Sequence, residues 1–159
     1  MKFHIREATQ KDYKGISEVF EEVDSLHCKA LPHIFREPDG SARTEEFISS
    51  IISDENATLF IAETNGQIIG LVHVLTKQAP PIPIMVSRRY AVLENLAVRE
   101  GYRRLGVGTS LLERAHQWAL SREVSQIESN VWEFNEEAIA FYRKQGYTTS
   151  RRWISRPLP

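Results

Sequence analysis

The 159-residue chain contains one cysteine and no long apolar run. The single cysteine, Cys28, excludes an internal disulfide, and no spacing of Cys and His matches a structural zinc site, so we expect no metal. No window is long and apolar enough to cross a bilayer, and the first residues lack the apolar stretch of a signal peptide. We therefore expect a cytoplasmic protein with no membrane partner.

An excess of charge of either sign is also absent. Lys and Arg number 20 and Asp and Glu 21, which gives a formal net charge of -1. No overall field draws such a protein to nucleic acid, and no stripe of basic and stacking aromatic residues offers a local binding surface. With 42% hydrophobic residues, the chain has the composition of an ordinary globular protein, and its length predicts one domain over residues 1–159.

The first part of the chain predicts a short strand and two helices. The first helix follows a capping-box-like pair, Thr9 and Asp12, and its apolar positions keep helical spacing until about His27. Prolines and an Asp-Gly pair in residues 28–41 predict a loop. Thr44 is a typical N-cap for a second, shorter helix.

Three β-prone runs follow. Residues 59–62 and 68–75 flank Asn65 and Gly66, a pair that strongly favours a hairpin turn, so we expect these runs to pair antiparallel. Residues 89–98 read as a long third strand after a proline-rich break.

The last part predicts a strand–helix–strand crossover, another helix and a final strand. A helix near Gly108 leads to a strand at 127–131, and Asn135 caps a helix that stops before Gly146. Residues 147–154 read as the last strand. The fold class is therefore α/β (α+β), with a mixed, mostly antiparallel, twisted sheet of six to seven strands and helices on both faces.

The most informative segment is a strand end followed by a glycine-punctuated turn into a helix. The strand ends with Leu96, Ala97 and Val98, and the turn and first helical residues are Arg103, Arg104, Leu105, Gly106, Val107, Gly108 and Thr109. Unpaired backbone N–H groups and the positive end of the helix dipole meet at such a turn, which suits a diphosphate. The glycines let the backbone approach phosphates, and the arginines add charge-assisted contacts. A plain tight turn is the alternative, because neither the dinucleotide fingerprint nor the P-loop is present.

A second motif lies on the following helix. It consists of Asn135, Ala138, Phe141, Tyr142, Gly146 and Tyr147. The first motif resembles the pyrophosphate-binding signature of the GNAT acetyltransferases, and the second resembles that family's motif beside the pantetheine arm of coenzyme A. The resemblance covers roughly residues 94–147, and the order of the earlier elements also fits. It implies a GNAT-like fold and acetyl-coenzyme A as the cofactor.

The resemblance also implies roles for individual residues. The segments 96–98 and 103–109 would bind the pantetheine and the pyrophosphate, and Asn135 would hydrogen-bond the arm. Tyr142 would contact the cofactor near its sulfur and protonate the departing thiolate, while Phe141 packs beneath the helix. The alternative for Tyr142 is an aromatic side chain that only joins the core.

Glu94 is the candidate general base. An alkyl ammonium with a pKa of about 10.4 is protonated at neutral pH, so a carboxylate acting through water would assist its deprotonation. Glu94 lies on the strand just before the cofactor segment, as in several similar GNAT enzymes. An ion pair with Arg88 or Arg89 is the alternative.

His27, His33 and Phe35 are weaker candidates for substrate binding. They fall in the early loop region that covers the acceptor pocket in similar proteins. A lone histidine with no partner is more often structural or exposed.

The resemblance implies direct transfer of an acetyl group to a primary amine of a small molecule or a protein, in a ternary complex. The rival reading is a non-catalytic acyl-coenzyme A-binding domain with a regulatory or interaction role. A strand edge near Arg151, Arg152 and Trp153 could support a homodimer, and it is equally compatible with local packing.

Overall fold

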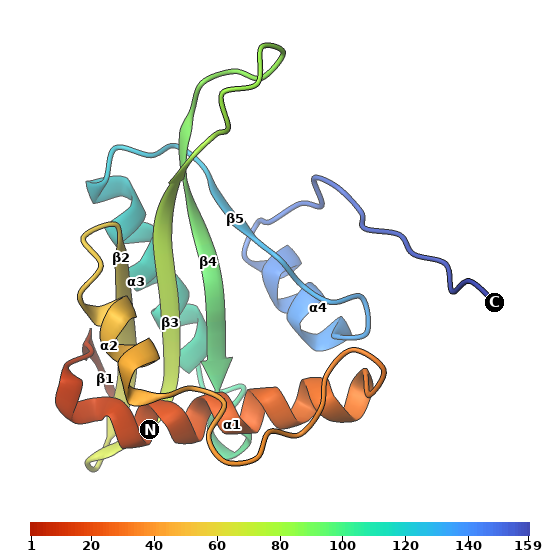
Figure 1. Ribbon diagram of the computed structural model, residues 1–159. Helices are drawn as coiled ribbons and strands as arrows, with labels where there is room; N and C mark the ends of the chain where they lie inside the picture. The colour runs from red at the N-terminus through yellow and green to blue at the C-terminus, as the bar shows by residue number, and fades with distance from the viewer.

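A computed structural model describes residues 1–159 as one five-stranded sheet with helices on both sides (Figure 1). The strands follow the chain order across the sheet and are β1 (His4–Glu7), β2 (Ala57–Thr64), β3 (Gln67–Gln78), β4 (Arg89–Val98) and β5 (Ile127–Ser129). The first three neighbouring pairs are antiparallel, and β4 and β5 are parallel. The α-helices are α1 (Tyr13–Ala30), α2 (Glu45–Ile52), α3 (Val107–Ser121) and α4 (Glu136–Lys144), with 3-10 turns η1 (Gln10–Asp12) and η2 (Glu100–Tyr102).

The helices divide between the two faces of the sheet. α1 and α2 pack on one face, where Ile16, Phe20 and Ile48 are buried with residues of β2 and β3. α3 packs on the other, around Leu111 and Leu112, and α4 lies beside β5 (Figure 1). None of these helices combines the length and the apolar character that crossing a bilayer demands. The mixed, mostly antiparallel sheet with helices on both faces is confirmed.

The hairpin turn and the N-termini of two helices form as the sequence predicts. Asn65 and Gly66 both have positive φ, of 49° and 73°, which is the backbone of a type I′ turn. The Thr44 and Asn135 side chains accept hydrogen bonds from the backbone N–H groups of Phe47 and Ala138, so both residues cap their helices.

Three expectations about the elements are wrong. The sheet has five strands instead of six to seven, because the expected strand at 147–154 is absent. Residues 148–159 are exposed throughout, since the chain after α4 runs away from the sheet and leaves the outer edge of β5 unpaired (Figure 1). α1 continues to Ala30 instead of ending near His27, and β5 stops at Ser129 instead of residue 131.

The sheet is irregular where β4 meets its two neighbours. The pairing of β3 with β4 passes from His73–Asn95 to Val74–Leu93, so Glu94 is the extra residue of a β-bulge. On the other side, β4 pairs with β5 only through residues 91–93. Beyond Leu93 the two strands part, and the end of β4 has no strand neighbour on that side.

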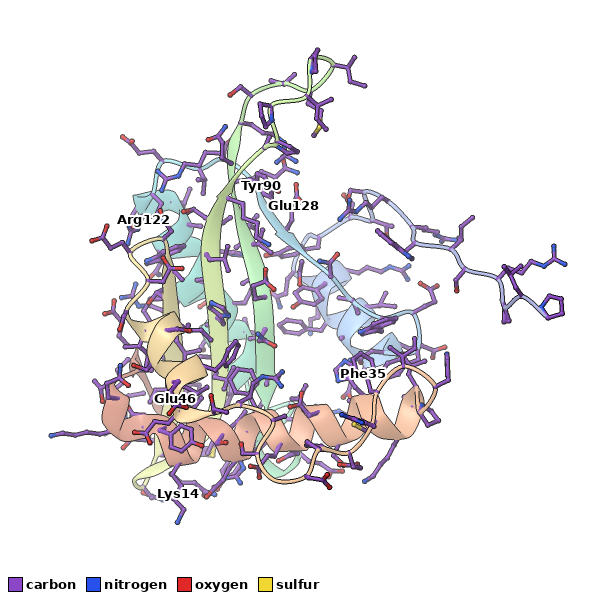
Figure 2. All side chains as sticks on the ribbon, viewed as in Figure 1. Lys14, Phe35, Glu46, Tyr90, Arg122 and Glu128 are labelled. Atoms are coloured by element: carbon purple, nitrogen blue, oxygen red, sulfur yellow. The ribbon has the colours of Figure 1, made fainter.

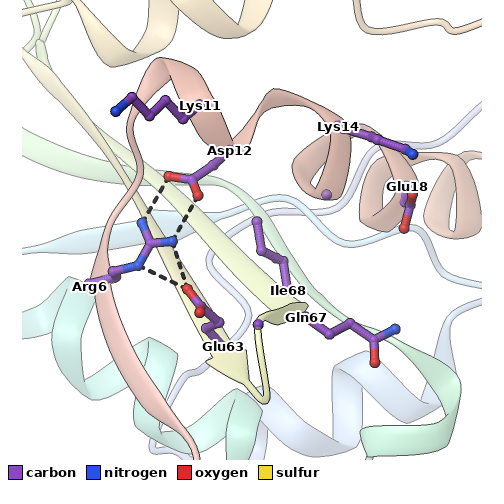
Figure 3. Close-up of a pocket in the computed structure, with 10 residues that line it drawn as sticks. Arg6, Lys11, Asp12, Lys14, Glu18, Glu63, Gln67 and Ile68 are labelled. Atoms are coloured by element: carbon purple, nitrogen blue, oxygen red, sulfur yellow. Dashed lines mark hydrogen bonds and ion pairs between the residues drawn. The ribbon is translucent and has the colours of Figure 1, made fainter.

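A polar network fastens the start of the chain to the sheet, beside a groove between β1, α1 and the β2–β3 turn (Figure 3). The Arg6 guanidinium binds Asp12 through two hydrogen bonds of 2.8 and 2.7 Å. It also binds Glu63 at 2.6 Å, so β1, β2 and the start of α1 share one cation. The groove is lined by residues from outside the two sequence motifs, and its arginine is already paired.

The network predicts an acid-sensitive part of the stability. Hydrogen bonds from Arg6 hold the pKa of Asp12 at about 2, below its usual 3.8, although burial opposes this shift. Because the folded-state pKa is lowered, the stabilisation is present above pH 3.8 and is lost as the pH falls towards 2. We expect Asp12→Asn to remove about 1–2 kcal/mol of unfolding free energy at pH 7 and to flatten its decline in this window. Urea unfolding from pH 6 to 2 measures both effects, with the exposed Asp39→Asn as the control, and a decline as steep as in the wild type would contradict the assignment.

Candidate functional site

The first part of the site is the unpaired edge of β4. The Val98 carbonyl accepts a hydrogen bond of 3.1 Å from Arg103 Nε, so the backbone polar groups of Val98 point away from β3. Because alternate residues of a strand direct their backbone groups to the same side, those of Leu96 also face the gap between β4 and β5. Ala97 lies between them with its side chain buried under α1. Because the Val98 carbonyl already accepts the hydrogen bond from Arg103, only the Val98 N–H remains for a ligand.

The N-terminus of α3 lies at the end of this gap. Gly106 is the N-cap and has a φ of 86°, a conformation that side-chain-bearing residues rarely adopt. The Val107 side chain is buried, so only its backbone can contact a ligand. A Cβ atom on Gly108 would lie 3.6 Å from Val98 and 3.7 Å from Phe141, between β4 and α4. Leu105 is exposed, and Thr109 accepts a bond of 3.4 Å from Gln145.

The two arginine side chains of this turn differ in their contacts and in their exposure. Arg103 is held by the Val98 carbonyl and lies 4.0 Å from carboxylates of both Glu22 and Glu137. The Arg104 side chain is 88% exposed and contacts only Glu137, at 3.5 Å. Arg104 is therefore the arginine that can turn towards an anion with little cost.

α4 carries the second motif and faces the same gap. The Asn135 side-chain oxygen caps the helix by accepting the Ala138 N–H at 3.1 Å, so only its amide N–H groups remain for a ligand. Tyr142 is partly buried, and its hydroxyl lies 3.3 Å from Ser129 Oγ on β5. Burial raises the pKa of Tyr142, and the hydrogen bond from Ser129 opposes this rise. Tyr142 is thus a protonated phenol where β4 and β5 part.

Aromatic contacts fix the Tyr142 ring. Phe141 and Tyr147 make edge contacts with it, at centroid distances of 5.5 and 5.1 Å. The Tyr147 hydroxyl is 2.7 Å from His116 Nε2 on α3. As expected, Phe141 packs on the core beneath the helix.

Glu94 lies on the face of the sheet that α1 and α2 cover only in part. Its carboxylate pairs with Lys77 at 2.9 Å, and its side chain is 38% exposed. The expected alternative partners bind elsewhere, Arg88 to Glu128 and Arg89 to Thr76. An exposed pair of this kind contributes little stability, so the carboxylate is free to change partner.

His73 lies deeper in the sheet, next to this bulge. Its side chain is 7% exposed, and the Nδ1 atom has no hydrogen-bond partner. Burial lowers the pKa of His73, while the charge of Glu94 raises it. The histidine is therefore a neutral side chain with an unused polar atom beside the candidate base.

Two of the three candidate substrate-binding residues meet in an aromatic cluster formed by His27, Phe35, Trp132 and Phe134. His27 lies 5.6 Å from both phenyl rings, and Phe35 is 5.5 Å from Trp132, measured between ring centroids. The cluster joins α1 and the loop after it to the β5–α4 loop, and Figure 2 shows Phe35 between α1 and α4. His33 is exposed and takes no part in the cluster.

Sequence reasoning missed the partners of the candidate residues: Ser129, Lys77, His73, Trp132 and Phe134. Ser129 and Trp132 lie between the two motifs, and proximity to Asn135 was the only signal that could have drawn attention to them. The contacts of Lys77 and His73 depend on the β-bulge, which no short-range pattern announces.

Comparison with known proteins identifies the family of the chain. The chain matches the acetyltransferase (GNAT) family over residues 20–147 and belongs to that family. An N-alpha-acetyltransferase of Sulfurisphaera tokodaii is 30% identical over 108 residues, which are 64% of this chain and 62% of that protein. This chain therefore spans less than two thirds of the length of that relative.

Solved structures share the fold over the whole chain. A mutant of the BH1408 protein from Bacillus halodurans is 26% identical, with a TM-score of 0.93 and coverage of 98% of this chain and 99% of that one. The aminoglycoside N-acetyltransferase AAC(6')-Iy in complex with coenzyme A is 15% identical, with a TM-score of 0.73 and coverage of 98% and 99%. Because only 15% of the residues are identical, the similarity to AAC(6')-Iy establishes a shared fold and nothing more.

The ion pairs of Glu137 predict a variant with tighter ligand binding. Glu137→Gln removes a carboxylate that competes for Arg104 and Arg103, so coenzyme A should bind about two- to fivefold more tightly at low salt. The gain should shrink at high ionic strength. Calorimetric titration measures it, and Glu136→Gln, an exposed acid of the same helical turn, is the matched control. Weaker binding by Glu137→Gln, or equal gains in both variants, would count against this arrangement.

Proposed function

We propose that this protein is an N-acetyltransferase that moves an acetyl group from acetyl-coenzyme A to a primary amine by direct attack in a ternary complex. The observation that carries the proposal is the gap between β4 and β5, which connects the N-terminus of α3 with the Tyr142 hydroxyl. Membership of the GNAT family supports it.

The residues around the gap fit coenzyme A. The backbone groups of Leu96 and Val98 can pair with the amide groups of a pantetheine arm, as a neighbouring strand would. Backbone N–H groups at the start of α3 face the diphosphate, and Arg104 adds the mobile charge. The Asn135 amide can donate to the arm from α4. Acetyl-coenzyme A supplies the acetyl thioester.

Glu94 is the proposed general base. Its carboxylate lies on the exposed face of β4, two residues before the proposed cofactor edge at Leu96. It accepts the proton of the acceptor ammonium through water, while the ion pair with Lys77 orients it. An amine that approaches from this face reaches the gap from the side opposite α3.

Tyr142 is the proposed general acid. It donates its phenolic proton to the leaving sulfur. A phenol is less acidic than a thiol, with pKa values of about 10 and 8.5, and burial widens this difference. The position of the hydroxyl therefore matters more than its acidity.

The aromatic cluster of His27, Phe35, Trp132 and Phe134 borders the proposed acceptor side. Trp132 is 43% exposed and can pack against the body of an acceptor or its cation. His27 donates a hydrogen bond from Nδ1 to the Val23 carbonyl, so its role is to hold the cluster in place. His33 is exposed outside this cluster, and we assign it no contact with a small acceptor.

Binding and turnover together test the proposal. Calorimetric titration should show binding of acetyl-coenzyme A, coenzyme A and a desulfo analogue, and a panel of amines should release free thiol. Tyr142→Phe should keep the cofactor affinity and lower kcat tenfold or more, because it removes only the proton donor. Failure of the folded protein to bind any of the three ligands would refute the acetyltransferase function. Binding without thiol release from any amine would favour the non-catalytic acyl-coenzyme A-binding domain.

A pH profile tests the base. Most of an alkylamine is protonated at pH 7, so Glu94→Gln should depress kcat/KM most at low pH. As the pH approaches 10, the free amine becomes abundant and the variant should recover towards wild-type rates. Glu128→Gln, which removes another ion-paired acid from the adjacent strand, is the control. A Glu94→Gln profile parallel to that of the wild type would leave the carboxylate a structural role only.

We also propose that the protein is a homodimer in which a second copy covers the C-terminal segment. Trp153, Ile154 and Leu158 are 83–90% exposed, so the local packing that the sequence left open does not occur. Sedimentation equilibrium should give a dimer for the wild type and a shift towards monomer for Trp153→Ser. Leu120→Ser, which alters an exposed apolar residue of α3, should leave the dimer intact. A wild-type protein that stays monomeric at high concentration would exclude this assembly.

A further inference from the structure

Ser129 lies at the point where β4 and β5 part. It is the last residue of β5, and it pairs with Leu93, the last β4 residue that contacts β5. Its hydroxyl oxygen is 3.3 Å from the Leu93 carbonyl oxygen and 3.3 Å from the Tyr142 hydroxyl. One side chain therefore links β5, β4 and α4 where the gap begins.

The Ser129 hydroxyl has a single hydrogen and two acceptors within reach. Both distances are long for O–H···O hydrogen bonds, as expected of a donor that is shared between two oxygens. Hydrogen bonds to charged acceptors are about twice as strong as those between neutral groups. The hydrogen should therefore turn from the Leu93 carbonyl to Tyr142 whenever that phenol loses its proton.

We propose that Ser129 is a positioning residue for Tyr142, which holds the phenol oxygen at the gap and stabilises the phenolate that proton donation leaves behind. The proposal rests on the acetyl-transfer function proposed above. In that reaction the amine nitrogen bonds to the acetyl carbon, the carbon–sulfur bond breaks, and the sulfur takes the Tyr142 proton. The proton that the amine nitrogen releases returns to the phenolate through solvent.

In the surroundings of Tyr142, no group other than Ser129 can stabilise the phenolate. The packed elements offer no cation to the phenolate: β4 contributes the Leu93 carbonyl, the segment after α4 contributes Tyr147, and α3 contributes His116 behind it. Burial lowers the pKa of His116, which keeps that ring neutral at pH 7. The hydrogen bond from Ser129 is the one influence that lowers the pKa of Tyr142. Without it, proton transfer from the phenol to a thiolate becomes more unfavourable.

A double-mutant cycle tests the link between the two residues. Ser129→Ala should lower kcat about tenfold, as loss of a hydrogen bond to a developing charge does, with little change in either KM. Ser129→Thr keeps the hydroxyl and should restore kcat to within about threefold of the wild type. In a Tyr142→Phe background, Ser129→Ala should have almost no further effect, because Ser129 acts through Tyr142. Multiplicative losses in the double variant, or no loss from Ser129→Ala alone, would overturn the proposal.

A titration of the protein alone separates this proposal from the acetyl-transfer function. With ¹³C-labelled tyrosine, the ring carbon that bears the Tyr142 hydroxyl is followed by NMR against pH and is identified by its absence in Tyr142→Phe. Its titration should move to higher pH in Ser129→Ala but not in Ser121→Ala, whose hydroxyl donates to the Trp118 carbonyl at the far end of α3. An unmoved Tyr142 signal would overturn the link even in an active enzyme. A moved signal in a protein without turnover would leave the link intact and refute the transfer function.

Discussion

The short pairing of β4 with β5 is the constraint on which the rest of the candidate site depends. Parallel strands normally continue side by side and satisfy each other's backbone groups, but here the pairing stops after residues 91–93. The end of β4 then keeps unpaired polar groups that face a gap, and unpaired groups of this kind require a partner or water. The bulge at Glu94 occurs one residue after the last pair and turns the strand at the same place. In the proposed complex, a ligand that supplies strand-like hydrogen bonds would complete this part of the sheet.

Each proposed chemical group takes its position from this divergence. α3 begins close to the end of β4, so its N–H groups point along the same gap, and α4 brings Tyr142 to the other end through Ser129. Glu94 reaches the opposite face because the bulge changes the alternation of side chains along β4. The proposed cofactor cradle, acid and base therefore come from three elements, β4, α3 and α4, around one interruption of the sheet. The core clusters on both faces pack against those elements.

The sequence predicted best what depends on short-range conformation. The hairpin at Asn65 and Gly66, the caps at Thr44 and Asn135, and the glycine turn before α3 each follow from the backbone preferences of one or two residues. Family membership followed from two such segments at their characteristic spacing. The fold class was predictable for the same reason.

Features that depend on distant neighbours were beyond sequence reasoning. Residues 147–154 have β-prone composition, yet a strand also needs a partner strand, and nothing local shows that the chain turns away from the free edge of β5. The ion pair of Glu94 with Lys77 depends on the register of β3 and β4, and an arginine nearer in sequence was the natural choice. The Ser129 contact with Tyr142 requires knowing where two strands separate.

The aromatic cluster gives the β5–α4 segment a second attachment to the rest of the molecule. On one side of the gap, this segment is joined to the sheet by the three pairs between β4 and β5. On the other, Trp132 and Phe134 contact Phe35 and His27, about one hundred residues earlier in the chain. If β4 and β5 were joined only by these pairs, the strands could move apart, and the separation between the β4 edge and α4 would vary. The proposed binding of a thioester between them requires a fixed separation. Attachment on both sides limits that opening, so the width of the gap is set by the N-terminal half of the protein as much as by the sheet.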